Sequence, residues 1–169
     1  MSALHILIIP SWYPEYPGDI NGSFFKEQAE ALAKHGCKVG VIYPQLRSMR
    51  NWRGVLKGGS GLSHESQNGI PTYRWHGVNW FPRIAKLNGW LWELHGTKLY
   101  KKYIENHGTP EIIHAHSLLY AGHLASKISE KSGIPFVVTE HSTAYARGIL
   151  NKSQIELAKS ASRSEERRV

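Results

Sequence analysis

The hydrophobic positions of this chain change repeatedly between strand-like runs and a helical period. Residues 5–9 are an apolar run that is too short for a helix and typical of a buried strand. Apolar side chains then recur with helical spacing between Ser23, a suitable N-cap, and Gly36, which is suited to end a helix. Residues 38–43 follow as a second apolar strand. This order predicts a right-handed crossover between two parallel strands.

The second half of the chain shows the same alternation. Residues 84–106 and 120–132 have helical spacing, whereas residues 72–75, 112–115 and 136–139 are runs of strand length. The whole pattern predicts an α/β fold, a Rossmann-like parallel sheet flanked by helices. From the first of the two helices, the side chains expected to face the core are Leu87, Leu91, Leu94 and Leu99.

Two segments stand outside the alternation. Residues 44–70 have no clear period and are expected to form a long functional or mobile loop. Residues 155–159 begin an amphipathic helix, but the charged tail at 161–169 loses its apolar face. We therefore expect one domain over residues 1–160. The tail is either non-native sequence after a truncation or an ordinary frayed terminus.

Composition sets broad limits on the function. A hydrophobic content of 41% and a charged content of 20% are typical of a soluble globular protein. We read neither a run of about 20 apolar residues nor a signal peptide in the sequence. The single cysteine, Cys37, cannot form an intrachain disulfide. A cytoplasmic location is therefore expected. The net charge of +8 favours anionic partners, among which nucleic acid, acidic lipids and sugar nucleotides all qualify.

The loop between the first strand and the first helix is a candidate ligand site. Residues 14–23 are rich in proline and glycine, which allows a ligand to approach the backbone closely. The helix that follows offers free N–H groups and a partial positive charge, which suit phosphate. The G-x-G-x-x-G fingerprint of dinucleotide binding is missing, and a plain connection is the alternative.

Histidines end two of the predicted strands. His114 and His116 are two positions apart, so both point to one face of the sheet. We expect His114 to pack in the structure and His116, nearer the strand end, to exchange a proton or donate a hydrogen bond near neutral pH. A metal pair is the competing interpretation, but no third or fourth ligand has suitable spacing, so no metal is expected. His141 and Ser142 end another strand, where Ser142 could instead be a helix N-cap.

Aromatic and basic residues alternate in the segment 79–102. This mixture suits a membrane interface with anionic lipids, where tryptophan lies at headgroup depth and lysine or arginine contacts phosphate. A helix packed through its leucines and tryptophans is the simpler interpretation, and stacking on single-stranded nucleic acid is a third, although no nucleic-acid motif is present. The candidates for membrane contact are Trp80, Arg83, Lys86, Trp90, Lys101 and Lys102.

Several of these segments, in this order and spacing, carry a resemblance to a known family. They cover the chain from residue 4 to about residue 160, and they are residues 8–14 with 18–29, residues 36–39, residues 112–117 with 121–122, and residues 135–142. On these residues the chain resembles the N-terminal domain of glycosyltransferase family 4, whose members have the two-domain GT-B fold.

The resemblance implies roles for the candidate residues. It places Gly18, Asn21, Gly22 and Ser23 near the diphosphate of the donor. It makes His116 the catalytic candidate in the cleft, close to the acceptor and the transferred sugar. It assigns acceptor binding, of an anionic acceptor in particular, to Ser117, His141 and Ser142.

The resemblance also implies an activity. The expected function is retaining transfer of a sugar from a nucleotide diphosphate donor to a hydroxyl acceptor, such as a glycolipid or polysaccharide precursor, by an enzyme of hexosyltransferase type without a cofactor. The donor-binding C-terminal domain is expected as the missing partner, so this chain alone is expected to be inactive. Peripheral contact with an anionic membrane is expected, whereas binding of nucleic acid is not. The alternative is a stand-alone, non-enzymatic module that binds a phosphorylated or membrane-associated ligand.

Overall fold

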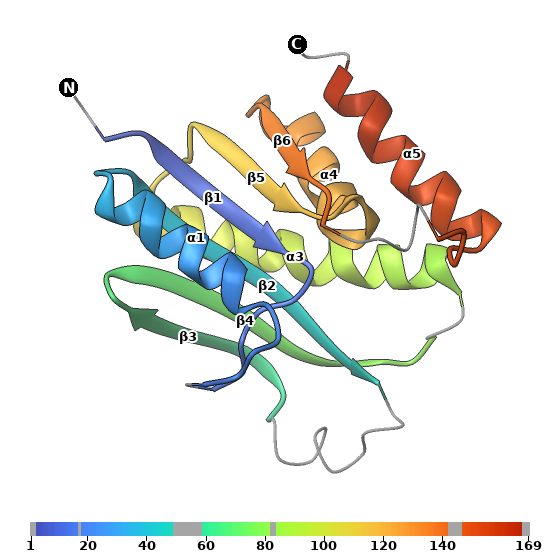
Figure 1. Cartoon of the computed structure of the whole chain (residues 1–169), viewed down its shortest axis with the longest axis horizontal. Coiled ribbons are helices and arrows are strands. Elements are labelled where there is room, and N and C mark those ends of the chain that lie inside the picture. The colour runs from blue at the N-terminus through green and yellow to red at the C-terminus, as the bar shows by residue number, and fades with distance from the viewer. Residues whose placement is uncertain (1–2, 17, 49–58, 82–83, 142–146, 167–169) are drawn as a thin grey trace.

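The protein is a sheet with helices on both faces (Figure 1). The computed structural model describes residues 3–16, 18–48, 59–81, 84–141 and 147–166. For residues 163–166 it describes the backbone alone. The six-stranded sheet has the order β3-β4-β2-β1-β5-β6. Its strands are β1 (His5–Pro10), β2 (Lys38–Ser48), β3 (Gly61–Gln67), β4 (Ile70–Asn79), β5 (Ile112–His116) and β6 (Phe136–Thr139).

The expected parallel crossovers are confirmed in the central strands. Strand β1 pairs in parallel with β2 on one side and β5 on the other, and β2–β4 and β5–β6 are parallel as well. Only β3 runs antiparallel within the described sheet, as a hairpin with β4. The carboxyl ends of the parallel strands therefore meet at one edge, where ligands of such folds bind.

The helices divide the core into two layers. Helix α1 (Ser23–Lys34) covers one face, where it packs on side chains such as Ile6, Ile8 and Val41. Helices α3 (Ala85–His107) and α4 (His123–Ser132) cover the other face, above Leu7, Ile9 and Ile113. Helix α5 (Lys152–Glu166) packs beside α3 and α4. A short turn, η2 (Leu118–Gly122), in which Leu119 and Tyr120 have non-helical backbone angles, joins β5 to α4.

The prediction of one long loop over residues 44–70 is wrong at both ends of this range. Strand β2 continues to Ser48, and residues 61–67 form β3. The turn of this hairpin is Asn68-Gly69, both with positive φ (53° and 77°), a pair that favours a two-residue hairpin. The alternation of exposed and half-buried residues along β3 belongs to an edge strand with one face in solvent.

The inward face of α3 also differs from the prediction. Leu91 and Leu99 are buried as expected, but Leu87 and Leu94 are each 37% exposed. Gly96 explains the difference, because a Cβ at this position would lie 2.2 Å from Leu124 Cδ2. Close packing of α3 on α4 at Gly96 fixes which side of α3 faces the core.

Two helix boundaries need correction. The N-cap of α1 is Gly22 rather than Ser23, and no side chain caps this end. Helix α5 extends to Glu166 with Ala158 and Ala161 fully buried, so an apolar contact reaches into the segment predicted to be a charged tail.

Candidate functional site

The loop that follows β1 is organised by the carboxylate of Asp19. This carboxylate accepts hydrogen bonds from the backbone N–H groups of Glu15 and Asn21 and from the Asn21 side-chain amide, each at 3.0 Å. The bond from the Glu15 N–H is the largest of the effects that lower the pKa of Asp19. Asn21 therefore uses both its backbone and its side-chain donor inside the loop. Asp19 was not among the residues predicted from sequence, although an Asp in a turn is known to accept a hydrogen bond from the backbone N–H two residues on.

Two arginines attach this loop to the sheet. The Nη2 atom of Arg74 on β4 donates to the Pro14 carbonyl at 2.6 Å and contacts Glu65 Oε1 at 2.9 Å. The Arg74 guanidinium also lies over the Tyr13 ring, 5.1 Å from its centroid. Arg47 on β2 pairs with Glu15 at 3.3 Å. The loop is thus fixed in place by buried and half-buried charges from neighbouring strands.

The loop ends at a glycine that no other residue can replace without strain. Gly22 has φ 72°, and a Cβ built on it would lie 2.6 Å from the Trp12 carbonyl oxygen. The left-handed backbone turns the chain into α1, so the positive end of the helix dipole faces the carboxyl edge of the sheet.

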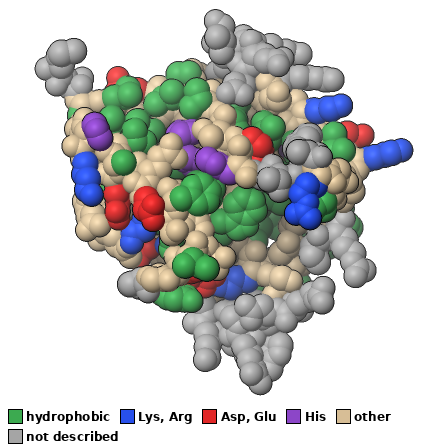
Figure 2. Space-filling model, in the orientation of Figure 1, with side chains coloured by type: hydrophobic (Ala, Val, Ile, Leu, Met, Phe, Trp, Pro, Cys, Tyr) green, Lys and Arg blue, Asp and Glu red, His purple; other side chains and the backbone are tan. Residues whose placement is uncertain are grey.

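The start of α1 lies against a cluster of imidazoles that we call the histidine cluster, made of His114, His116 and His141. The Phe25 ring is 4.6 Å from the His116 ring, and the Phe24 ring is 4.9 Å from the His141 ring. The two predicted regions, the loop after β1 and the strand ends of β5 and β6, are therefore at one site. Figure 2 shows histidine side chains beside apolar ones at the centre of this face.

Within the histidine cluster the three imidazoles have different surroundings. The rings of His114 and His116 are 4.2 Å apart, as expected for two residues on one face of a strand. His114 Nε2 is hydrogen-bonded to Thr139 Oγ1 at 2.8 Å, which fits the expected packing role. His116 is completely buried, with its Nδ1 3.3 Å from His141 Nε2, and His141 is exposed.

Burial determines the protonation of His116. Desolvation, with smaller contributions from the nearby His114 and His141, lowers the pKa of His116 to about 3. With this pKa the imidazole is neutral at neutral pH, which favours the expected hydrogen-bonding role over proton exchange. A neutral imidazole still has one N–H donor and one acceptor nitrogen, so the expected hydrogen-bonding role remains open to it.

Glu140 links the ends of β5 and β6. Its Oε2 atom accepts a hydrogen bond from the Leu118 N–H at 2.8 Å and from the Ser117 hydroxyl at 3.4 Å. Ser117 (φ 81°) and Tyr120 (φ 63°) both have left-handed backbones, which are strained for residues with side chains. Glu140 thus holds the strained turn after β5.

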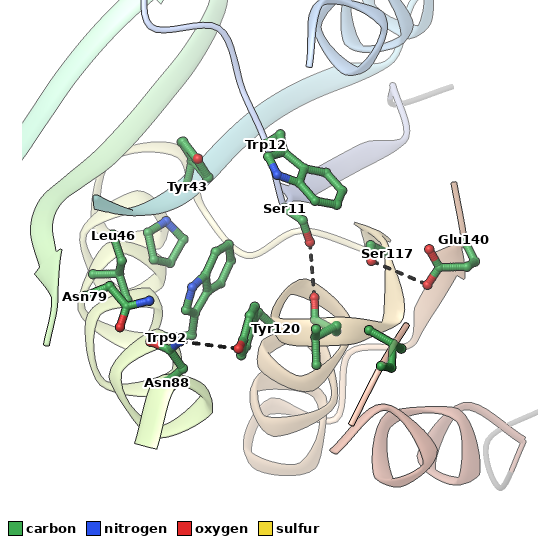
Figure 3. A pocket seen from close by; sticks show the side chains of 13 residues that line it. Ser11, Trp12, Tyr43, Leu46, Asn79, Asn88, Trp92, Ser117, Tyr120 and Glu140 are labelled. Carbon is green, nitrogen blue, oxygen red and sulfur yellow. Dashed lines mark hydrogen bonds between the residues drawn. The ribbon is translucent and has the colours of Figure 1, made fainter. Parts of the chain in front are cut away.

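A pocket lies on the other side of this turn, between the carboxyl ends of the strands and α3 (Figure 3). It has a volume of about 340 Å³. Ser11 lines the pocket, and its hydroxyl donates a hydrogen bond shared between the carbonyls of His116 (3.0 Å) and Leu119 (3.2 Å). The residues that line the pocket are mostly aromatic or aliphatic, with a few polar groups, and they include Trp12, Tyr43, Leu46, Asn79, Asn88, Trp92, Ser117, Tyr120 and Glu140.

Ser117 is the one residue lining this pocket that was predicted from sequence to be a site residue. Asn88 and Trp92 are four residues apart on the buried side of α3, so they share one helix face. A polar Asn among apolar inward positions is a signal that could have indicated a site. It was missed because Leu87 and Leu94 were taken to mark the inward face.

The remaining candidates lie elsewhere or outside the described residues. Ser142 and Arg83 are not among the described residues. The other membrane candidates are exposed and lie just after β4 or on α3: Trp80, Lys86, Trp90, Lys101 and Lys102. Lys86 contacts Glu156 at 3.7 Å, and Lys102 contacts Glu105 at 3.2 Å.

Two absences concern only the residues that the structure describes. No group of three or more His, Cys, Asp or Glu side chains in this part of the chain is arranged to hold a metal ion. No helix within the same residues is long and apolar enough to span a bilayer.

Comparison with known proteins identifies the family. The model of the family described as Glycosyltransferase Family 4 matches residues 22–167. The chain belongs to this family. The match includes α1, the histidine cluster and the turn held by Glu140, so the expected membership is confirmed. No curated protein matches the chain.

A solved structure confirms the fold class. The catalytic domain of Starch Synthase IV from Arabidopsis thaliana, bound to ADP and acarbose, has a similar fold, with a TM-score of 0.53 and 14% sequence identity. The similarity covers 83% of this chain and 34% of that one, so the family 4 chain described here spans about a third of the length of the starch synthase domain. The expected Rossmann-like half of a GT-B architecture is thereby supported.

Proposed function

We propose that the whole protein transfers a sugar from a nucleotide diphosphate donor to a hydroxyl acceptor, with retention of the anomeric configuration, and that this chain forms the acceptor side of the site. One observation carries the proposal. The N-terminus of α1, the exposed imidazole of His141 and the pocket beside Ser117 meet at the carboxyl edge of the sheet in a family 4 glycosyltransferase domain.

The contribution of the loop to donor binding is electrostatic. The Asn21 donors bond to Asp19, and the Ser23 N–H donates to the Ile20 carbonyl at 3.3 Å. The main favourable interaction with a diphosphate is therefore the dipole of α1, whose first turn contains no acidic residue. Such a fixed dipole stabilises the charge that develops on a departing diphosphate. The starch synthase domain of similar fold is bound to ADP, a nucleoside diphosphate, which supports this class of donor.

The two histidines have different roles in this proposal. His141 is exposed and provides the imidazole that contacts the acceptor or the transferred sugar. The fully buried His116 bonds to His141 and holds it in position. Ser117, fixed by Glu140, presents its strained backbone at the edge of the pocket.

The test uses the complete gene product and a panel of nucleotide diphosphate sugars. Release of nucleoside diphosphate that depends on a hydroxyl acceptor supports the proposal, and NMR of the product reports the anomeric configuration. Saturable binding of ligands without any transfer would support the stand-alone binding module instead. Transfer with inversion would overturn the retaining mechanism alone.

We also infer that the outer face of α3 contacts an anionic membrane on its cytoplasmic side. Trp80 is 60% and Trp90 54% exposed. Lys101 lies on the same side of the helix as Trp90, because eleven residues correspond to about three turns. Exposed tryptophan beside lysine suits the headgroup region of anionic lipids.

A further inference from the structure

The pocket beneath Ser11 contains one polar group that lacks a partner. Asn88 is 3% exposed, and its side-chain amide donates to the Tyr120 hydroxyl at 3.3 Å. Its Oδ1 atom is buried, and no hydrogen-bond partner for it occurs among the described residues. Leaving a buried amide oxygen without a hydrogen bond is unfavourable, and a ligand hydroxyl in the pocket would remove this cost. Asn88 lines the pocket, so such a ligand can reach it (Figure 3).

The walls around Asn88 are flat and aromatic. The Trp92 and Tyr120 rings are stacked with an interplanar angle of 19° and a centroid distance of 5.8 Å, and Tyr43 meets Trp92 edge-on at 6.1 Å. The strained backbone of Tyr120 (φ 63°, ψ −59°) is held in place while its ring and hydroxyl contact Trp92 and Asn88. Strain of this kind is maintained where the surrounding structure fixes a functional side chain.

The charge of the pocket limits its ligand further. Among the lining residues that the structure describes, Glu140 is the only one with a charged side chain, and no lysine or arginine is present. An anionic group placed there would lose its hydration without a cation to compensate. A volume of about 340 Å³ is at the lower end of the range of about 300–1,000 Å³ for small-molecule sites.

The geometry points to a binding site for an uncharged, polyhydroxylated ring, a neutral sugar unit of the acceptor, with one hydroxyl donating to Asn88 Oδ1 and the apolar face of the ring against Trp92 and Tyr120. This inference depends on the proposed function for the identification of the site as the acceptor side. The part of the acceptor that enters this pocket is then neutral, whereas the sequence resemblance implied an anionic acceptor. The inference also makes Asn88 a specificity-determining residue, since an apolar ring without a hydroxyl would leave the amide unpaired.

Binding to the full chain tests the inference without any transfer reaction. The probes are the methyl glycosides of glucose, galactose and mannose, the matching hexuronates, and cyclohexanone, a ring without a hydroxyl donor, measured by saturation-transfer NMR and calorimetry. We expect at least one neutral glycoside to bind more tightly than its hexuronate and than cyclohexanone. Tighter binding of a hexuronate or of cyclohexanone, or no binding of any glycoside, overturns the inference. This comparison needs no variant.

Variants then locate the contact. Asn88→Ala is expected to weaken glycoside binding about tenfold, the effect of one lost hydrogen bond. Tyr120→Phe keeps the stacked ring and is expected to change binding less than threefold, because the Asn88 oxygen remains. The matched control is Asn106→Ala, an exposed Asn on the same helix. An unchanged affinity in a folded Asn88→Ala protein overturns the assignment of the contact.

The outcomes for the two proposals can be distinguished. If the complete protein transfers sugar and no neutral glycoside binds at Asn88, the neutral pocket is wrong and the proposed function stands. If glycosides bind at Asn88 and no nucleotide sugar supports transfer, the pocket stands and the proposed function is wrong.

Discussion

The Nδ1 atom of His116 lies 3.3 Å from the Nε2 atom of His141, so a fully buried imidazole is bonded to an exposed one at the carboxyl edge of the sheet. A neutral His116 has one proton to donate and one nitrogen to accept with. Its bond to His141 therefore fixes which role the second nitrogen, Nε2, takes. The pair therefore couples the protonation state of the buried His116 to the orientation of the exposed His141 side chain in the candidate site.

The buried His116 predicts that acid destabilises the protein. Its folded pKa, lowered to about 3, is below the ordinary value of 6.5. The unfolded chain therefore binds a proton that the folded chain excludes between these two values, and stability falls as pH decreases from about 6.5 towards 3. One such group contributes up to about 1.4 kcal/mol per pH unit in this window.

The measurement is urea unfolding of the wild type and His116→Gln at pH 7.5 and pH 5. We expect the variant to be less stable at pH 7.5 but to lose less stability between the two values. The control is His35→Gln, at an exposed position outside the histidine cluster. The same loss of stability in the variant and the wild type would contradict the assignment to His116.

His141 is predicted to affect activity more than stability. Because the side chain is exposed, His141→Ala is expected to change the melting temperature by less than about 2 °C. Loss of its contact with ligand is expected to lower kcat/KM of the complete protein about tenfold or more. His141→Asn, which restores a donor of similar reach, is expected to recover part of this loss. A variant with full activity would remove His141 from the site.

Gly22 and Gly18 form a matched pair for testing the loop. Both have positive φ, 72° and 88°, so alanine at either position has a backbone cost of about 1 kcal/mol. A Cβ added at Gly18 would meet open space, whereas at Gly22 the Trp12 carbonyl oxygen would be only 2.6 Å away. Gly22→Ala is therefore expected to reduce the free energy of unfolding by clearly more than Gly18→Ala. Equal losses in denaturant unfolding would show that the contact with Trp12 is not limiting.

The sequence predicted the framework of the fold from its apolar runs. The runs at 5–9, 38–43 and 112–115 lie in central parallel strands, which carry apolar residues on both faces, and the run at 136–139 lies in the parallel edge strand β6. Residues 72–75 of β4 were predicted as a strand, but β3 was missed because its sequence is mostly polar, with one face in solvent. The pair Asn68-Gly69 was the available signal for it.

Less of the candidate site could be predicted. Two-residue spacing placed His114 and His116 on one face, and the ring distance of 4.2 Å agrees. Burial of His116 depends on Phe25, which is distant in sequence, and no local pattern reports such a contact. The pocket at Asn88 depends on the phase of α3, which close packing at Gly96 sets and which leucine spacing alone predicted incorrectly. The roles assigned by resemblance to Gly18, Asn21, Gly22, Ser23 and Ser142 remain predictions.

Arg74 is predicted to couple the hairpin to the loop after β1. Its buried guanidinium bonds to the Pro14 carbonyl and to Glu65, whose side chain is 40% exposed. Arg74→Met keeps much of the side-chain volume but leaves the Pro14 carbonyl without its donor, so we expect a loss of about 1–3 kcal/mol in unfolding free energy. Glu65→Gln keeps an acceptor for Arg74 and is expected to cost less. The reverse order in urea unfolding would contradict the anchoring role of the Pro14 contact.

The outer face of α3 gives the last prediction, on membrane contact. The protein is expected to sediment with vesicles that contain phosphatidylglycerol and to stay in solution with purely zwitterionic vesicles at moderate salt, because lysine attraction to the surface depends on anionic lipid. Trp90→Ala and Lys101→Glu are each expected to reduce the bound fraction several-fold, since both side chains are exposed on that face. The matched control is Leu62→Ala, an apolar side chain that is 43% exposed on the edge strand β3. Equal effects of the control and Trp90→Ala, or binding independent of anionic lipid, would show that α3 is not a specific membrane surface.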